Sequence, residues 1–253
     1  MKDLQMEGKI AKVLIDKGYL LFNSKTNNTS FTQNPEADAL IKDIDPYHYP
    51  HAFLLACLMD RKIKAEKAWS IPLKIKTAFQ SFSITDLMAR SLEDYVVLFN
   101  NDNLHRFNDV MAEIFYNAIK QVHSTYKGDA SQIWSNKPCS ASVVYRFLQF
   151  QEAGIKIAIM AANILARDFK VPMSDHYSID VSPDTHVKRV FRRLGFINEG
   201  NGNDEIIYKA RELNPDFPGI LDLAVWEIGR YWCKPKTPEC EKCYLVSLCP
   251  KLN

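Results

Sequence analysis

Four cysteines near the end of the chain have the residue type and spacing of a metal-binding set. Cys233, Cys240, Cys243 and Cys249 follow the pattern C-x6-C-x2-C-x5-C. Four thiolates in so short a segment can hold a [4Fe–4S] cluster, in which each iron takes one cysteine ligand. They could also bind a zinc ion in tetrahedral coordination. The spacing favours the cluster, and zinc stays open as the alternative.

Two further side chains could do chemistry. The segment FQEAGIKIA, residues 150–158, predicts the end of one helix, a turn at Gly154 and a second helix with Lys156 in its first turn. Backbone N–H groups at such a helix start suit a phosphate, and a lysine amine is a potential nucleophile. Asp184, in SPDTHV, stands where another helix begins. Taken singly, Lys156 would be a surface lysine and Asp184 an N-cap.

The elements that must position these residues are predicted to be helices, because apolar residues recur with a helical period. Prolines fall between the periodic segments, where helices begin or end. Strand patterns are scarce, and Tyr19–Phe22 is one short tempting run. The sequence therefore predicts an all-α fold with loops near residues 23–34, 100–103, 172–182 and 198–203. The predicted helices cover residues 52–60, 63–69, 104–126, 155–169, 187–194 and 220–231.

Composition sets the broad class of the protein. The chain has 253 residues, 47% hydrophobic and 25% charged, with a formal net charge of +2. These values are ordinary for a folded globular protein. The start, MKDLQMEG, has neither the apolar core nor the cleavage site of a signal peptide, and the apolar runs are too short to span a bilayer. We expect an intracellular, cytoplasmic protein without a membrane partner, whose thiols favour metal over disulfides.

In chain order, these motifs resemble the helix–hairpin–helix (HhH-GPD) base-excision DNA glycosylases of the endonuclease III type. FQEAGIKIA resembles the family hairpin LPGVGxKTA, and PDTHVKRV resembles VDTHxxRV. IGRYWC resembles HGRYxC, which leads into the four-cysteine loop. The resemblance extends over about residues 52–250. It implies a [4Fe–4S] cluster on the four cysteines, with Lys156 as the catalytic lysine and Asp184 as the catalytic aspartate.

The resemblance also implies an architecture of two helical lobes with the active cleft between them. One lobe, residues 46–171, would be a helix bundle that ends in the helix–hairpin–helix motif. The other, residues 1–45 plus 172–253, would carry the cluster loop. Because the family's usual glutamine is absent from LMDR, Met59 or Arg61 is expected to serve as the wedge into the DNA stack. The other expected DNA contacts are Ala153, Gly154, Ile155, Lys234 and Lys236.

Several positions depart from the family pattern. Gln151 and Glu152 stand where the family has Pro and Gly, and an acidic residue in a phosphate-binding turn is electrostatically unfavourable. The interval from Lys156 to Asp184 and the N-terminal segment are both longer than usual. These differences indicate a branch with its own lesion preference, for which His176 and Tyr177 are candidate pocket residues.

The implied function is that of a DNA N-glycosylase and AP lyase. The implied partner is double-stranded DNA with a damaged or mismatched base, bound by a monomer in the nucleoid. Lys156 would form a Schiff base with the sugar. Two other functions remain open: a monofunctional glycosylase in which Lys156 only touches phosphate, and a non-catalytic iron–sulfur DNA-binding protein. Basic clusters at residues 61–67, 188–193 and 230–236 could bind phosphate or could be solvated helix faces.

Overall fold

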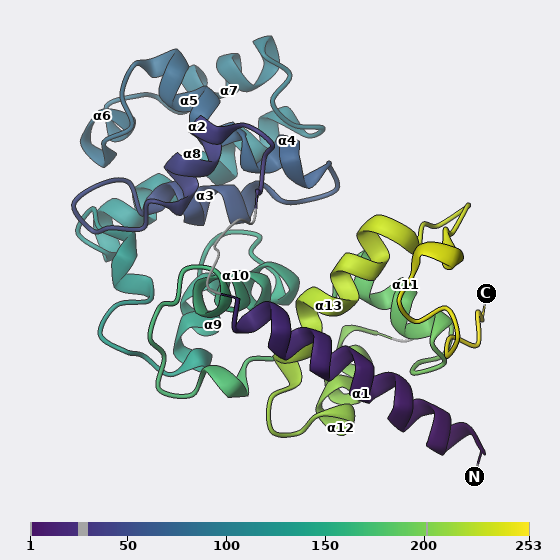
Figure 1. Ribbon diagram of the computed structural model, residues 1–253. Helices are drawn as coiled ribbons and strands as arrows, with labels where there is room; N and C mark the ends of the chain where they lie inside the picture. Colours follow the sequence, from purple (N-terminus) through teal and green to yellow (C-terminus); the bar gives the residue numbers. More distant parts are fainter. Residues whose placement is uncertain (1, 25–29, 201, 253) are drawn as a thin grey trace. The chain divides into compact units, whose positions relative to one another are not determined.

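The computed structural model describes residues 2–24, 30–200 and 202–252. Residues 25–29 of the loop expected at 23–34, and residue 201 of the loop expected at 198–203, lie outside the described residues. Throughout the described ranges the regular elements are helices, and none of these residues forms a strand (Figure 1). The prediction of an all-α fold is confirmed. The strand-like run Tyr19–Phe22 is the end of helix α1 (Lys2–Phe22).

The chain divides into two units. The first unit comprises residues 1–27, 139–141 and 162–253, and the second comprises residues 28–138 and 142–161. The expected boundaries were at residues 46 and 171. Lys156 and the hairpin belong to the second unit, whereas Asp184 and the four cysteines of the C-terminal loop belong to the first.

Helix α3 (His51–Met59) lies at the centre of the second unit. Its sequence HAFLLACLM has almost no polar face, and every one of its residues is buried. Such a helix must be covered on all sides, and it contacts α2, α4, α5 and α8. The remaining elements of this unit are α2 (Pro35–Lys42), α4 (Ala65–Trp69), α5 (Ile71–Phe79), α6 (Ile84–Met88), α7 (Leu92–Asn101), α8 (Asn108–Thr125), η1 (Ala130–Ile133), most of α9 (Ser140–Leu148) and the start of α10 (Ile155–Arg167).

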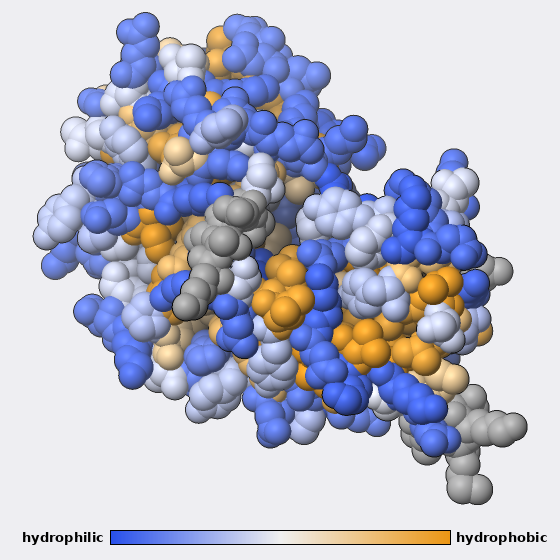
Figure 2. Space-filling model, viewed as in Figure 1, coloured by the Kyte–Doolittle hydropathy of each residue, from blue (hydrophilic) through white to orange (hydrophobic). Residues whose placement is uncertain are grey.

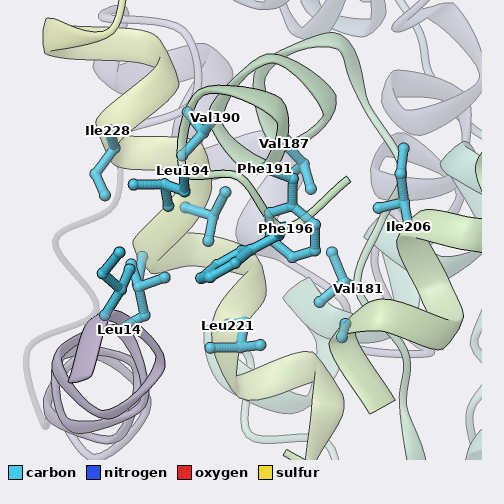
Figure 3. Packing of buried hydrophobic residues seen from close by; sticks show 14 of the residues in the cluster. Leu14, Val181, Val187, Val190, Phe191, Leu194, Phe196, Ile206, Leu221 and Ile228 are labelled. Atoms are coloured by element: carbon cyan, nitrogen blue, oxygen red, sulfur yellow. The ribbon is translucent and has the colours of Figure 1, made fainter. Parts of the chain in front are cut away.

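Helix α1 organises the first unit by packing along α13 (Leu221–Glu227). The approach is close, since a Cβ atom on Gly18 would lie 2.1 Å from the carbonyl oxygen of Ile220. Phe191 and Phe196 lie among Leu14, Ile206 and Leu221 in the core (Figure 3). The other elements are the end of α10, η2 (His176–Ser178), α11 (Thr185–Arg193), α12 (Asn203–Leu213), η3 (Pro218–Ile220), the π-helical turn η4 (Ile228–Trp232) and η5 (Cys240–Lys242).

The face shown in Figure 2 is mostly hydrophilic, with hydrophobic residues gathered near α1. Several large apolar side chains of this helix are well exposed, among them Leu20. In the part of the chain that the structure describes, no helix combines the length and apolar character needed to cross a membrane.

Candidate active site

The hairpin of the second unit joins α9 to α10. The turn is closed by a hydrogen bond from the N–H of Ala153 to the carbonyl of Phe150, at 3.0 Å. Helix α10 begins with the N–H of Ile157 donating to the carbonyl of Gly154, also at 3.0 Å. Gly154 is exposed, and no heavy atom lies within 4 Å of where its Cβ would be. The first N–H groups of α10 have no carbonyl partner within the helix, so an anion can approach them.

Lys156 lies in the first turn of α10, where its amine contacts Asp60. The Nζ atom donates to the Oδ2 of Asp60 at 2.7 Å and to the main-chain carbonyl of Asp60 at 3.3 Å. The lysine side chain is 29% exposed and the aspartate side chain 14% exposed. Asp60 directly follows the last residue of the buried helix α3. The candidate nucleophile is thus held against a carboxylate that the core positions.

A second ion pair joins the same two segments. Arg61 donates to the Oε2 of Glu152 at 3.1 Å, with side chains 34% and 56% exposed. Glu152 has a φ of +61°, in the left-handed region. Glycine adopts this region without the steric penalty that a Cβ introduces. The resemblance placed a family glycine at this position, and the backbone conformation gives the physical reason for it.

His105 supports the turn that carries Asp60 and Arg61. The ring is fully buried, and its Nδ1 accepts a hydrogen bond from the N–H of Phe107 at 3.1 Å. Burial lowers the pKa of His105, while the backbone of Met59 and Arg61 beside the ring opposes that shift. A neutral imidazole therefore lies beneath the turn. No sequence pattern singled out His105, because its role depends on contacts across more than 40 residues.

Two of the expected DNA contacts, Met59 and Ala153, are buried. Met59 is 0% exposed because it closes the all-buried helix α3. Ala153 is 8% exposed, and its N–H is already donated within the turn. Gly154 is exposed, and Ile155 and Arg61 are partly exposed. Arg61 therefore remains the wedge candidate of this segment.

Asp184 in the first unit is the N-cap of α11. Its Oδ1 accepts a hydrogen bond from the N–H of Val187 at 2.7 Å. The segment before it is anchored from α13, since the N–H of Ser182 donates to the Oδ1 of the buried Asp222, also at 2.7 Å. The N–H of Asp184 donates in turn to the carbonyl of Ser182 at 2.8 Å. Asp222 thus fixes the position of Asp184 through two hydrogen bonds.

The four cysteines of the C-terminal loop line one hollow, which is partly open to solvent. Burial raises the pKa of the Cys243 and Cys249 thiols, and the neighbouring cysteine thiolates raise both further. Among the described residues, no group of three or more His, Cys, Asp or Glu side chains is arranged to hold a metal ion. In a four-iron cluster each cysteine binds a different iron, so its ligands need not converge on one point. The apolar lining consists of Val190, Leu194, Ile228, Trp232, Leu245 and Val246.

Two arginines of α11 hold the start of this loop. Arg189 donates to the carbonyls of Cys233 and Gly229 at 2.6 and 2.7 Å. Arg193 donates to the Sγ of Cys233 at 3.3 Å and to the carbonyl of Lys234 at 2.8 Å. The sequence allowed this basic cluster to be a phosphate-binding patch. The structure instead engages these two guanidinium groups with the loop backbone and a cysteine sulfur.

The two lysines of the loop differ in their surroundings. Lys234 is paired with Glu239, which Lys242 also contacts at 2.6 Å. These two ammonium groups lower the pKa of Glu239 to about 2. Lys236 is exposed. Of the candidate pocket residues, His176 stacks on Phe22 with ring centroids 5.5 Å apart, whereas Tyr177 is half exposed.

Solved structures share this architecture over almost the whole chain. A trapped endonuclease III–DNA covalent intermediate, an estranged-adenine complex, has a TM-score of 0.64 and 16% identity over 96% of both chains. The chain has the fold of endonuclease III. The structure of a thermostable thymine-DNA glycosylase matches with a TM-score of 0.62 and 16% identity, again over 96% of both chains. No family model matches the sequence.

In addition to the shared fold, part of the sequence is similar to curated proteins named endonuclease III. Endonuclease III of Thermotoga maritima is 35% identical over 66 residues, which are 26% of this chain and 31% of that protein. Endonuclease III of Bacillus subtilis is 33% identical over 73 residues, 27% of this chain and 32% of that protein. The matched stretch is thus about a third of each relative's length. The resemblance that the motifs indicated is confirmed by both kinds of comparison.

Proposed function

We propose that this chain is a base-excision DNA glycosylase with an AP-lyase step. It acts as an intracellular monomer on double-stranded DNA that carries a damaged or mismatched base. The observation that carries the proposal is the amine of Lys156, which lies in the first turn of α10 beside an exposed turn. The endonuclease III fold and the relatives of that name support it.

In the proposed reaction the target nucleotide leaves the duplex stack, which costs a few kcal/mol and less for a damaged or mispaired base. The amine of Lys156 forms a bond to C1′ of the deoxyribose, and the base departs with the electron pair of the glycosidic bond. The carboxylate of Asp184 stabilises the positive charge that develops on the sugar. The Lys156 nitrogen then loses a proton, its lone pair breaks the C1′–O4′ bond, and the ring oxygen takes up a proton, which leaves a Schiff base on Lys156. Loss of a proton from C2′ then expels the 3′ phosphate.

Phosphate contacts position the duplex for this chemistry. In the second unit, backbone N–H groups can donate to phosphate from the exposed turn at Gly154 and from the start of α10 at Ile155. Lys236 supplies an exposed ammonium group on the cysteine loop. Arg61 and Lys234 can add phosphate contacts only when their pairs with Glu152 and Glu239 break. We assign Arg61 as the wedge, because its side chain is partly exposed whereas Met59 is buried.

The residues around the C-terminal hollow fit a [4Fe–4S] cluster held by Cys233, Cys240, Cys243 and Cys249. Four thiols and an apolar lining are the donor set and surroundings that such clusters use. The group would supply structural order, because full cysteine ligation leaves no iron for the substrate. Iron and acid-labile sulfide measured in purified protein test this assignment. Four irons per chain support it, and zinc without iron would contradict it.

Borohydride trapping on a duplex with one abasic site tests the function. Wild-type protein should give a covalent protein–DNA adduct and a nicked strand, and Lys156→Ala should give neither. On duplexes with one damaged base, Asp184→Asn should slow base release, while Asp184→Ala also loses the cap, worth about 1 kcal/mol. A wild-type protein that forms no adduct on abasic DNA and releases no base from a panel of lesions would refute the proposal.

A further inference from the structure

The nucleophile Lys156 has a carboxylate partner in its own unit. Asp60 Oδ2 lies 2.7 Å from Nζ, and the main-chain carbonyl of Asp60 lies 3.3 Å from the same atom. We propose that Asp60 is a further catalytic residue, which accepts a proton from the Lys156 ammonium before attack and returns it to the departing oxygen. This inference rests on the proposed function, since it concerns the same amine.

The position of Asp60 is determined by the core rather than by a flexible surface segment. It follows α3, whose residues are all buried, and its N–H donates to the carbonyl of Cys57 at 3.2 Å. The N–H of Arg61 donates to the carbonyl of Met59 at 2.8 Å, which closes the turn. The buried ring of His105 lies against that turn. A carboxylate held in this way keeps its place when the lysine moves toward a substrate.

The pair also differs from an ordinary surface ion pair. Exposed pairs contribute about 0–1 kcal/mol, because water competes for both partners. Lys156 and Asp60 are 29% and 14% exposed, and the lysine amine has two acceptors from one residue. The other ion pair of this hairpin, Arg61 with Glu152, is more exposed and does not involve the amine of Lys156. The arrangement therefore directs one carboxylate at the reacting nitrogen.

The proton transfers balance for an abasic aldehyde. Asp60 Oδ2 takes a proton from the ammonium, which leaves a neutral amine and a carboxylic acid. The amine nitrogen attacks C1′ and forms a carbinolamine, as one proton passes from nitrogen to the former aldehyde oxygen. The acid then gives its proton to that hydroxyl, the C–O bond breaks and water departs. The products are an iminium ion on Lys156 and a carboxylate on Asp60, as at the start.

The experiment measures adduct formation and DNA affinity separately. Wild-type protein, Asp60→Asn, Asp60→Glu and Glu113→Gln are mixed in excess with an abasic duplex, and the adduct is trapped with borohydride at intervals. Glu113 is an exposed carboxylate on α8 in the same unit, so its variant carries the same charge change as Asp60→Asn. Affinity for a duplex with a reduced abasic site, which cannot form the imine, is measured for each variant. Thermal unfolding shows which variants are folded.

The rate of adduct trapping by Asp60→Asn should be lower than that of wild type by a factor of about 100 or more, which is the usual contribution of a general acid–base residue. Its affinity for the reduced abasic duplex should be equal to that of wild type or higher, because a negative charge is lost. Asp60→Glu should recover at least a tenth of the wild-type rate, and Glu113→Gln should match wild type.

Three results would overturn the assignment. One is a trapping rate for folded Asp60→Asn within threefold of wild type. Another is equal slowing by Asp60→Asn and Glu113→Gln, which would reflect net charge. The third is a loss of DNA affinity that accounts for the whole loss of rate, since a structural ion pair would behave that way. Failure of wild-type protein to form any adduct would refute the lyase step of the proposed function, and is seen before any variant is compared.

Discussion

Replacing Glu152 with glycine should leave stability nearly unchanged while it strengthens DNA binding. Glu152 has a φ of +61°, and relief of a left-handed conformation contributes about 1–2 kcal/mol. The greater freedom of glycine in the unfolded chain costs about 0.4–1 kcal/mol. In the ion pair with Arg61, the side chain of Glu152 is 56% exposed and that of Arg61 is 34% exposed. Because water competes for both partners, loss of this pair costs roughly 0.2–1 kcal/mol. These contributions nearly cancel in the free energy of unfolding.

The effect on DNA binding does not cancel. Removing the carboxylate releases Arg61 for a phosphate, and each phosphate contact adds about 0.9 to the slope of log affinity against log salt concentration. The gain over wild type should therefore shrink about threefold between roughly 0.05 and 0.2 M salt. Fluorescence anisotropy with a labelled reduced-abasic duplex at several salt concentrations measures both quantities. Glu152→Gln is the matched control, because it removes the charge and keeps the strained backbone.

Two outcomes would refute this reasoning. The first is that Arg61→Gln and Glu152→Gln both leave the slope of log affinity against log salt concentration at its wild-type value. Arg61 would then contact no phosphate, either in wild-type protein or when the charge of Glu152 is removed. If Glu152→Gly lowers the free energy of unfolding by more than about 2 kcal/mol, the exposed pair is stronger than surface ion pairs are and the conformational argument fails.

Three other predictions concern the parts of the fold that position the site. On helix α1, Gly18→Ala should destabilise by about 1–3 kcal/mol through overpacking, since its Cβ would meet the carbonyl of Ile220; Gly8→Ala, with open space around it, should stabilise by about 1 kcal/mol. Met59→Ala should lower the free energy of unfolding by about 2–5 kcal/mol, with the affinity of folded protein for DNA unchanged. Burial lowers the pKa of His51 from 6.5 to about 4, so the unfolded chain binds this proton first. Stability should fall as pH drops from about 6.5 to about 4, and His51→Gln should reduce that slope; all three are measured by denaturant unfolding.

Helices with strong apolar periodicity could be predicted from the sequence. The predicted segment 52–60 is α3 (His51–Met59), and 155–169 is α10 (Ile155–Arg167), because continuous burial leaves a clear pattern. The segment 220–231 becomes α13 followed by a π-helical turn. Helix α1 was not predicted, because lysines and glycines dilute its apolar stripe. Its order comes from packing on α13 rather than from local propensity.

The site could be predicted only in part, because the spacing of motifs does not report burial or long-range contacts. The turn before Lys156 and the cap at Asp184 are local features, and their residue types predict them. Proposing Arg61 rather than Met59 as the wedge required knowing that α3 is buried up to its last residue. The contact between Asp60 and Lys156 joins positions 96 residues apart. No local pattern could have paired them.

The distribution of partners changes what the basic residues of this chain can do. Counting lysines and arginines near the motifs suggests broad phosphate-binding surfaces, yet Arg189 and Arg193 are engaged with the cysteine loop. Lys234 and Arg61 are each paired with a glutamate. A cation that neutralises a neighbouring carboxylate releases no counterion from DNA unless that pair breaks, so it adds little to affinity. Under the proposed function, and with a net charge of only +2, we expect DNA binding to depend mainly on the N–H donors of the hairpin, on exposed cations such as Lys236 and on contacts to the extruded nucleotide. In the proposed glycosylase, recognition would then rest on the distorted site more than on the duplex around it, which suits the search for one altered base among many normal ones.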